Sequence, residues 1–323
     1  MKLKEHFLDL QLAEPQRGAH ITIFPLLSNR LYDVHYQTMD DSINRGDLQI
    51  TEISEEGKVP LLEARNNVER EILLLDSEEI IGAKQNRALN TSILLPRNKR
   101  TIIPVSCTES GRWDYNSHGF FPSRFMMPPK VRYNKMKSVS AYASKLADEE
   151  LRNLQEKNSA ACVFYSDQSE VWSNVEDFKF MTGSKSPTSA MKDAMEDIRE
   201  DINQIIDQFP LQKSQAGVLV MQNNRVTGLD FLSQPKAYSE LHKKIISSYV
   251  SESVIEKNPR NHMHKTDVAR AREFLDLITE SKGQTFQSAG EGVDVRYSSA
   301  SYSGMALIHK NEPIHVSFLS YDA

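Results

Sequence analysis

The chain has 323 residues, of which 39% are hydrophobic and 26% are charged, with only 13 glycines and 13 prolines. These proportions exclude collagen-like and disordered proteins, and no apolar run approaches the ~18 residues that cross a bilayer. The formal net charge of −5 argues against nucleic acid as the main partner, because neutralising phosphates requires a basic surface.

The N-terminal part of the chain has the residue pattern of strands. Short β-branched runs between polar residues predict strands at 21–27, 33–36 and 48–53, and Met39–Arg45, closed by Gly46, predicts a short helix. Four more apolar runs follow at 72–75, 80–81, 93–95 and 102–105. We interpret these four runs as a meander of consecutive antiparallel strands.

In such a meander the connections after the second and fourth strands lie at the same end of the sheet. They are residues 82–87 and 107–113. Their side chains offer three cations, two amides, a carboxylate, a thiol and an indole, namely Lys84, Arg87, Arg112, Gln85, Asn86, Glu109, Cys107 and Trp113. Loops on a rigid sheet often carry function, but polar turns that only satisfy backbone geometry would contain the same residue types.

Beyond these loops the pattern changes. Residues 114–134 are aromatic and basic without a clear period, and we interpret them as an irregular linker or lid that either stacks a base beside phosphate or caps the sheet. Helical periods follow at 139–146, 191–209, 238–249 and 268–278, the second with Ser186 and Pro187 at its start and the last capped by Thr266. Asn223-Asn224 predicts a tight hairpin, and strands at 293–297, 306–308 and 314–318 complete the series.

These elements predict an α+β fold. A β-rich N-terminal sheet or sandwich, residues 10–134, carries the two loops, and a mixed helix-and-hairpin lobe, residues 135–323, follows it in one compact unit. The chain has only two cysteines, Cys107 and Cys162, which we expect to be unbonded. A disulfide framework is therefore not predicted, and a reducing cytoplasm fits the composition.

Cys107 is one candidate for a catalytic residue. Its thiol would be reactive if Lys84, Arg87 and Arg112 lowered its pKa, whereas a buried cysteine would be inert. The spacing from Cys107 to Arg112 matches the anion-binding loops of rhodanese-like enzymes. No helical period follows Arg112, however, so we attribute the match to chance.

Carboxylates are the other candidates. Glu78, Glu79 and Glu109 could serve glycosidic-bond chemistry, which commonly uses two carboxylates, and only Glu109 is well placed in the meander. The acids between 193 and 201 fit a solvated helix face, and His262-Met263-His264 fits an exposed loop because no cysteine pair or helical histidine pair accompanies it. No metal site is therefore predicted, and the cofactor stays unknown.

Several short motifs occur along the chain, namely Leu74-Leu75-Asp76 with Glu78-Glu79, Gly82–Arg87, Leu89–Ser92, Ile103–Cys107 with Glu109, Gly111, Arg112 and Trp113, and further on Glu170–Trp172, Ser186–Thr188 and Gly228–Phe231. In these motifs the chain resembles the ADP-ribosylglycohydrolase- and rhodanese-phosphatase-superfamily-associated protein family 1. The resemblance covers roughly residues 10 to 250, and Ser77 departs from it where the family commonly has glycine.

The resemblance implies a component of NAD-derived ADP-ribose metabolism and supplies no catalytic residues. We therefore expect a protein that binds ADP-ribose or a related NAD-derived nucleotide, with hydrolysis of that ligand left open. The ligand-binding residues would be cations for pyrophosphate, amides for ribose hydroxyls and an indole for stacking, namely Lys84, Arg87, Arg112, Gln85, Asn86, Asn90 and Trp113.

The alternative is a non-catalytic interaction module that docks through the same loops onto a partner enzyme of ADP-ribose metabolism. A large pocket at the loops would favour the nucleotide, and a flat apolar patch would favour the partner enzyme.

Overall fold

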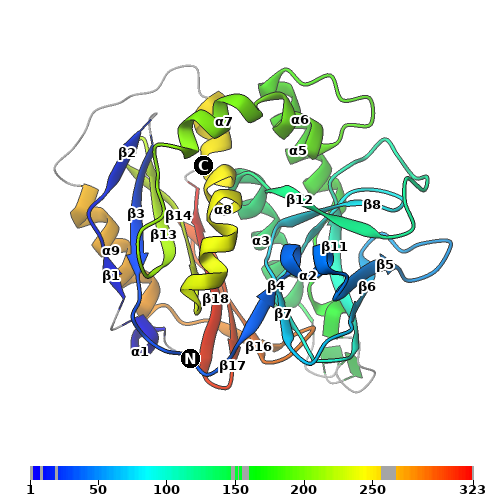
Figure 1. Ribbon diagram of the computed structural model, residues 1–323, viewed down its shortest axis with the longest axis horizontal. Coiled ribbons are helices and arrows are strands. Elements are labelled where there is room, and N and C mark those ends of the chain that lie inside the picture. Colours follow the sequence, from blue (N-terminus) through cyan, green and yellow to red (C-terminus); the bar gives the residue numbers. More distant parts are fainter. Residues whose placement is uncertain are drawn as a thin grey trace.

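The computed structural model in Figure 1 describes residues 3–7, 10–18, 21–146, 150–151, 153–154, 160–255 and 267–321. The fold is α+β, as the sequence predicts. Within these residues the strands form a nine-stranded, a six-stranded and a three-stranded sheet. None of the helices described is both long and apolar enough to cross a membrane.

The nine-stranded sheet joins the start of the chain to its last third. Its order is β1-β3-β13-β14-β18-β17-β16-β15, with β2 also paired to β3. The strands are β1 (Gln11–Leu12), β2 (Gln16–Gly18), β3 (Ile21–Leu27), β13 (Gln215–Gln222), β14 (Arg225–Leu232), β15 (Gln284–Gln287), β16 (Val293–Ser298), β17 (Tyr302–His309) and β18 (Glu312–Ser320). This sheet contains strands from both predicted lobes. The boundary between the lobes at residue 134 stays a prediction.

The two smaller sheets replace the expected meander. The six-stranded sheet has the order β12-β8-β9-β11-β6-β5, and the three-stranded sheet has the order β10-β7-β4. Their strands are β4 (Tyr36–Thr38), β5 (Leu48–Glu52), β6 (Leu61–Asn66), β7 (Glu71–Leu74), β8 (Glu78–Gly82), β9 (Arg87–Leu89), β10 (Ile93–Leu95), β11 (Arg100–Cys107) and β12 (Phe120–Met126). The meander prediction is therefore wrong, because β7 pairs with β10 and β4 while β8 pairs with β9 and β12.

The turn between β7 and β8 explains the difference. Ser77 has a positive φ of 67°, and the Glu78 carboxylate accepts a hydrogen bond from the amide of Leu75 at 2.8 Å. This tight turn sends the chain from one sheet into the other. The next strand, β9, has only three residues and begins with Arg87, so the hydrophobic pattern missed it.

Local signals placed several elements correctly. Strand β3 and helix α2 (Met39–Arg45) have the predicted bounds, and Gly46 closes the helix with a φ of 79°. The β13–β14 hairpin turns at Asn223 and Asn224, which have φ values of 50° and 65°. Cys107 and Cys162 are free thiols, as expected.

Other helices differ from the sequence prediction. The helix expected at 191–209 is two helices, because Ile198 leaves helical geometry with φ −106° and ψ 10°. Segment 114–134, expected to be irregular, contains β12 and the start of α3, where Pro129 occupies the first turn. His262-Met263-His264 and Thr266 lie outside the described residues. The helices are α1 (Lys4–Phe7), α3 (Pro129–Ala143), a 3₁₀ turn η1 (Ala160–Val163), the unpredicted α5 (Gln168–Thr182), α6 (Met191–Asp197), α7 (Arg199–Ile206), α8 (Pro235–Ile255) and α9 (Asp267–Glu280).

Helices cover both faces of the nine-stranded sheet. Helices α1 and α9 lie on one face, where Phe7 and Phe274 share a core with Phe231 of β14. Helix α8 lies on the other face, between this sheet and the smaller sheets (Figure 1), and its Ile245 shares a core with Val218 of β13. The smaller sheets have a third core of their own.

A network of buried charges joins these layers at helix α3. Lys135 binds the carboxylate of Asp76, in the β7–β8 turn, and donates to the carbonyl of Leu89 at 2.8 Å. One turn earlier, Arg132 donates to Asp230 of β14 at 2.7 Å. Both ion pairs are fully buried. Helix α3 therefore connects the turn between the two smaller sheets to the centre of the large one.

Neighbouring polar groups extend the network. Tyr249 of α8 donates to Asp230 at 2.7 Å, and Ser92 lies 2.6 Å from the Nδ1 of His315. Although burial opposes ionisation, Arg132 and His315 hold the pKa of Asp230 well below its usual range. Asp230 is therefore ionised in the core at neutral pH. Removing either partner of such a pair lowers the stability of the fold, because the remaining charge would be buried without a counter-ion.

We expect Lys135→Met to lower the free energy of unfolding by roughly 3–5 kcal/mol, since it leaves Asp76 unpaired in the core. Lys130→Met is the matched control on the same helix, where the partner Asp177 is 3.8 Å away and the two side chains are 33% and 60% exposed. It should change stability by less than about 1 kcal/mol. Urea denaturation measures both, and equal losses in the two variants would contradict the role of the network.

Candidate functional site

The two predicted loops meet. Strands β9 and β11 are neighbours, with Cys107 opposite Arg87, and the loops continue from these paired positions. The amide of Thr108 donates to the carbonyl of Asn86 at 3.0 Å, and the amide of Asn86 donates to Glu109 at 3.1 Å. The prediction that residues 84–87 and 107–113 converge is therefore confirmed, although the strands that bring them together are not those of a meander.

Arg112 joins the two loops with its whole guanidinium group. Its Nε and Nη2 donate to the two carboxylate oxygens of Glu109 at 3.1 and 2.7 Å. Its Nη1 donates to the carbonyls of Ala83 and Asp114 at 2.6 and 2.8 Å. Burial opposes ionisation of Glu109, but Arg112 keeps the pKa of this carboxyl below its usual value. Arg112 thus holds the loops in place before any ligand arrives.

A second buried cluster lies beneath the loops. Arg87 donates to the Sγ of Cys107 at 2.9 Å and to Gln85 at 2.8 Å, and its Nη2 is 3.6 Å from Glu52 at the end of β5. Burial raises the pKa of Cys107 to about 11, in spite of the neighbouring Arg87. The thiol is therefore protonated at neutral pH, which favours the inert alternative for Cys107. Sequence reasoning missed Glu52, because only sheet pairing brings it here.

The carboxylates separate into different environments. Glu79 accepts hydrogen bonds from the hydroxyls of Thr108 and Ser123 at 2.8 and 2.9 Å, directly behind the loops. Burial raises its pKa to about 7. Glu78 instead pairs with Lys244 of α8 at 3.1 Å. Asn90 is also away from the loops, since it follows β9 and donates to the carbonyl of Phe164 at 3.0 Å.

The exposed part of the site is aromatic and cationic. Trp113 is 45% exposed and Tyr115 is 46% exposed. The Lys84 ammonium lies 5.4 Å from the Trp113 ring and 5.0 Å from the Tyr115 ring, and the Arg87 guanidinium carbon lies 5.5 Å from Trp113. These distances are within the range of cation–π attraction. We call Lys84, Trp113 and Tyr115 the aromatic platform; the sequence prediction did not include Tyr115.

Two backbone segments support the platform. Gly57, with a φ of 73°, packs so closely that an added Cβ would lie 3.3 Å from Trp113 and 3.4 Å from Lys84. On the other side the amide of Gly111 donates to the carbonyl of Thr188 at 2.8 Å, and an added Cβ on Gly111 would lie 2.8 Å from the Cα of Thr188. Glycine is therefore required where the 107–113 loop meets the segment before α6.

The family comparison covers almost the whole chain. A model of the ARPP-1 family, the ARG and Rhodanese-Phosphatase-superfamily-associated Protein domain, matches residues 9–319. The chain belongs to this family. The ARPP-1 name describes an association with ARG and with the rhodanese-phosphatase superfamily. Searches of curated proteins and of solved structures give no significant match.

Most of the motifs on which the sequence resemblance rests lie in two places in the structure. Residues of Gly82–Arg87, Glu109, Gly111–Trp113 and Ser186–Thr188 surround the loop pair. Asp76, Ser92 and Asp230, from three other motifs, belong to the buried charge network.

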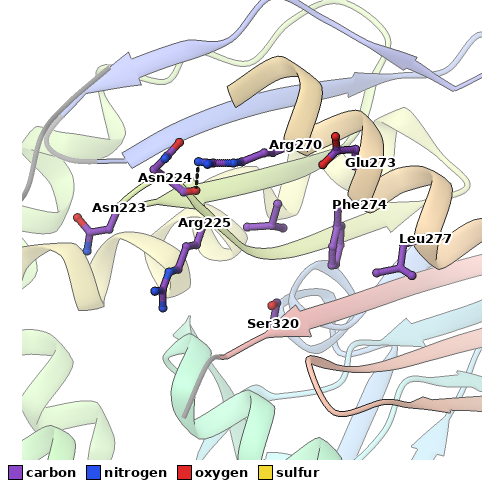
Figure 2. Close-up of a pocket in the computed structure, with 9 residues that line it drawn as sticks. Asn223, Asn224, Arg225, Arg270, Glu273, Phe274, Leu277 and Ser320 are labelled. Carbon is purple, nitrogen blue, oxygen red and sulfur yellow. Dashed lines mark hydrogen bonds between the residues drawn. The ribbon is translucent and has the colours of Figure 1, made fainter. Parts of the chain in front are cut away.

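A separate cavity of about 630 Å³ lies between the β13–β14 hairpin and α9 (Figure 2), where Arg270 donates to the carbonyl of Asn224. It contains none of these motif residues.

Arg112→Ala should lower the free energy of unfolding by roughly 2–3 kcal/mol, because Glu109 would lose its charged partner and the carbonyls of Gly82, Ala83 and Asp114 would lose a donor. Hydrogen exchange should rise at the amides of residues 83–86. Arg124→Ala, at a 64% exposed side chain 3.8 Å from Glu196, should change stability by less than about 1 kcal/mol. Urea denaturation and hydrogen exchange test this, and unchanged exchange would mean that Arg112 does not hold the loops.

Glu79 should make stability depend on pH. Its pKa is about 7 in the folded chain against an ordinary value of 4.5, so between these values the folded state keeps a proton that the unfolded state loses. The contribution of this carboxyl is therefore present below pH ~4.5 and lost as the pH rises to ~7, by roughly 3 kcal/mol in total. Glu79→Gln should remove this fall, whereas Glu200→Gln, at an exposed position, should keep it. Urea denaturation at pH 5 and 7.5 measures it, and identical pH dependence in the Glu79 variant would refute the assignment.

Proposed function

We propose that the loop pair binds ADP-ribose or a related NAD-derived nucleotide through the aromatic platform. The observation that carries this proposal is the half-exposed ring of Trp113 with the Lys84 ammonium beside it. An aromatic plane stacks the base of a nucleotide, and an adjacent ammonium attracts its phosphates. The ARPP-1 name records only an association with ARG and the rhodanese-phosphatase superfamily, and the setting in ADP-ribose metabolism is what the sequence resemblance implies.

The contacts divide the expected ligand-binding residues into two groups. Trp113 is half-exposed, and Lys84 is partly buried, with its ammonium donating to the carbonyl of Glu56 at 3.1 Å. These two side chains would touch the ligand. Gln85, Asn86, Arg87 and Arg112 bind one another or the loop backbone, so their part is to position the platform. Asn90 would act only through β9, because its side chain is buried between Phe164 and Ser106.

Binding is better supported than hydrolysis. Glycosidic-bond chemistry needs one carboxylic acid and one carboxylate at the reacting bond. Glu109 is ionised, but both its oxygens accept hydrogen bonds from Arg112 and one also accepts from the amide of Asn86. Glu79 would keep a proton near neutral pH but is fully buried. We therefore propose a binding protein.

Trp113→Ala should weaken binding of ADP-ribose by roughly five- to 100-fold, because stacking contributes about 1–3 kcal/mol per base. Phe180→Ala removes an 85% exposed aromatic ring from α5 and serves as the control. Isothermal titration calorimetry with ADP-ribose, with circular dichroism to confirm folding, measures both variants. Equal affinity of the Trp113 variant and the wild type, or no binding by the wild type, would refute the proposal.

The second candidate is a docking module for a partner enzyme of ADP-ribose metabolism. It is favoured by a third exposed ring near the loops, that of Phe121, which is 56% exposed and lies opposite Ile81 of β8. Exposed aromatic residues commonly anchor protein interfaces. Size-exclusion chromatography with a purified ADP-ribosylglycohydrolase tests this candidate. A complex that forms with the wild type and is lost in Phe121→Ala, while ADP-ribose binding is unchanged by the substitution, would support the docking function.

A further inference from the structure

A basic pocket lies at the other end of the six-stranded sheet. It has a volume of about 310 Å³ and is lined by Arg65, Asn66, Asn67, Asn98, Lys99 and Arg100. Strand β11 runs from Arg100 at this end to Cys107 at the loop pair, so the two sites are separated by the length of a strand. The pocket is independent of the proposed nucleotide site.

Two arginines that line this pocket come from neighbouring strands. In the antiparallel pairing of β6 and β11, Arg65 is the direct partner of Arg100. Side chains at such positions lie on the same face about 5 Å apart, and like charges there destabilise a sheet. Lys99, which immediately precedes Arg100 in the chain, also lines the pocket and adds a third positive charge. This repulsion lowers the stability of the protein when no ligand is bound. A bound anion would neutralise the charges and remove the repulsion, which would account for the arrangement.

The surrounding charges leave this positive field in place. Glu63 lies 3.7 Å from Arg100, and the pair is weak because the Arg100 side chain is 64% exposed and the Glu63 side chain is 30% exposed. Glu69 accepts a hydrogen bond from Asn98. The side-chain amide of Asn66 donates to the carbonyls of Arg70 and Pro96 and thereby fixes the turn that forms the wall of the pocket.

We propose that this pocket binds a phosphate group, either free phosphate or the terminal group of a small phosphate ester. Two guanidinium groups supply paired N–H donors that match phosphate oxygens, and the lysine adds a point charge. The small volume and the flanking Glu63 and Glu69 fit a single compact anion. They do not fit an extended polyanion, which needs a longer basic surface.

The test is calorimetric titration with inorganic phosphate and with glycerol phosphate, which has no base to stack on Trp113. Sodium chloride at equal ionic strength corrects for screening. We expect one or both compounds to bind the wild type, and Arg65→Gln and Arg100→Gln each to weaken that binding by at least ~10-fold. The compound that binds identifies free phosphate or an ester as the source.

Arg17→Gln is the matched control, because it removes the same charge from exposed β2, on the opposite side of the molecule in Figure 1. It should leave phosphate affinity unchanged. Thermal unfolding checks the variants. Without phosphate, Arg65→Gln should have an unfolding temperature at least as high as that of the wild type, since the substitution removes the repulsion. Added phosphate should raise the unfolding temperature of the wild type but not that of Arg65→Gln. Absence of binding, equal weakening by Arg17→Gln, or retained affinity in Arg65→Gln and Arg100→Gln would each overturn the proposal.

Discussion

The buried charges on helix α3 are the constraint on which the arrangement of the sheets depends. Arg132 and Lys135 lie one turn apart, and each has a buried aspartate from a different layer as its partner. A hydrophobic core tolerates small shifts between layers, because apolar contact has no preferred direction. A buried ion pair does not, since a displaced partner leaves a desolvated charge. The network therefore fixes the position of α3, and with it the relative placement of the β7–β8 turn and the large sheet.

The same principle operates at the loop pair. The sequence analysis interpreted the density of cations there as a surface for phosphates, yet most of these cations are engaged by the protein itself. Arg87 lies under Trp113, and Arg112 spans the two loops. Preorganisation of this kind lets a small exposed surface act as a rigid binding platform, because few side chains must become ordered when a ligand arrives.

Local sequence signals predicted only what depends on neighbouring residues. The bounds of α2 follow from Gly46 and those of the β13–β14 turn from Asn223-Asn224, and both were correct. Strand partners depend on distant segments, so the pairing of β7 with β10 and of β8 with β9 was not predictable from spacing. The loops were predicted to meet, but Glu52 and Tyr115 were missed. Glu52 reaches the site only through the pairing of β5, β6 and β11, which no local pattern reveals.

The position of β3 in the large sheet has a consequence for synthesis of the protein. Strand β3 ends at Leu27, and its main partner β13 begins at Gln215. During translation almost two hundred residues must therefore leave the ribosome before the apolar strand β3 gains its main partner. An unpaired edge of this kind can join a wrong strand of the same or another chain. Nascent chains should thus depend on chaperones until β13 emerges, and stalling between these two strands should increase aggregation more than stalling after β14.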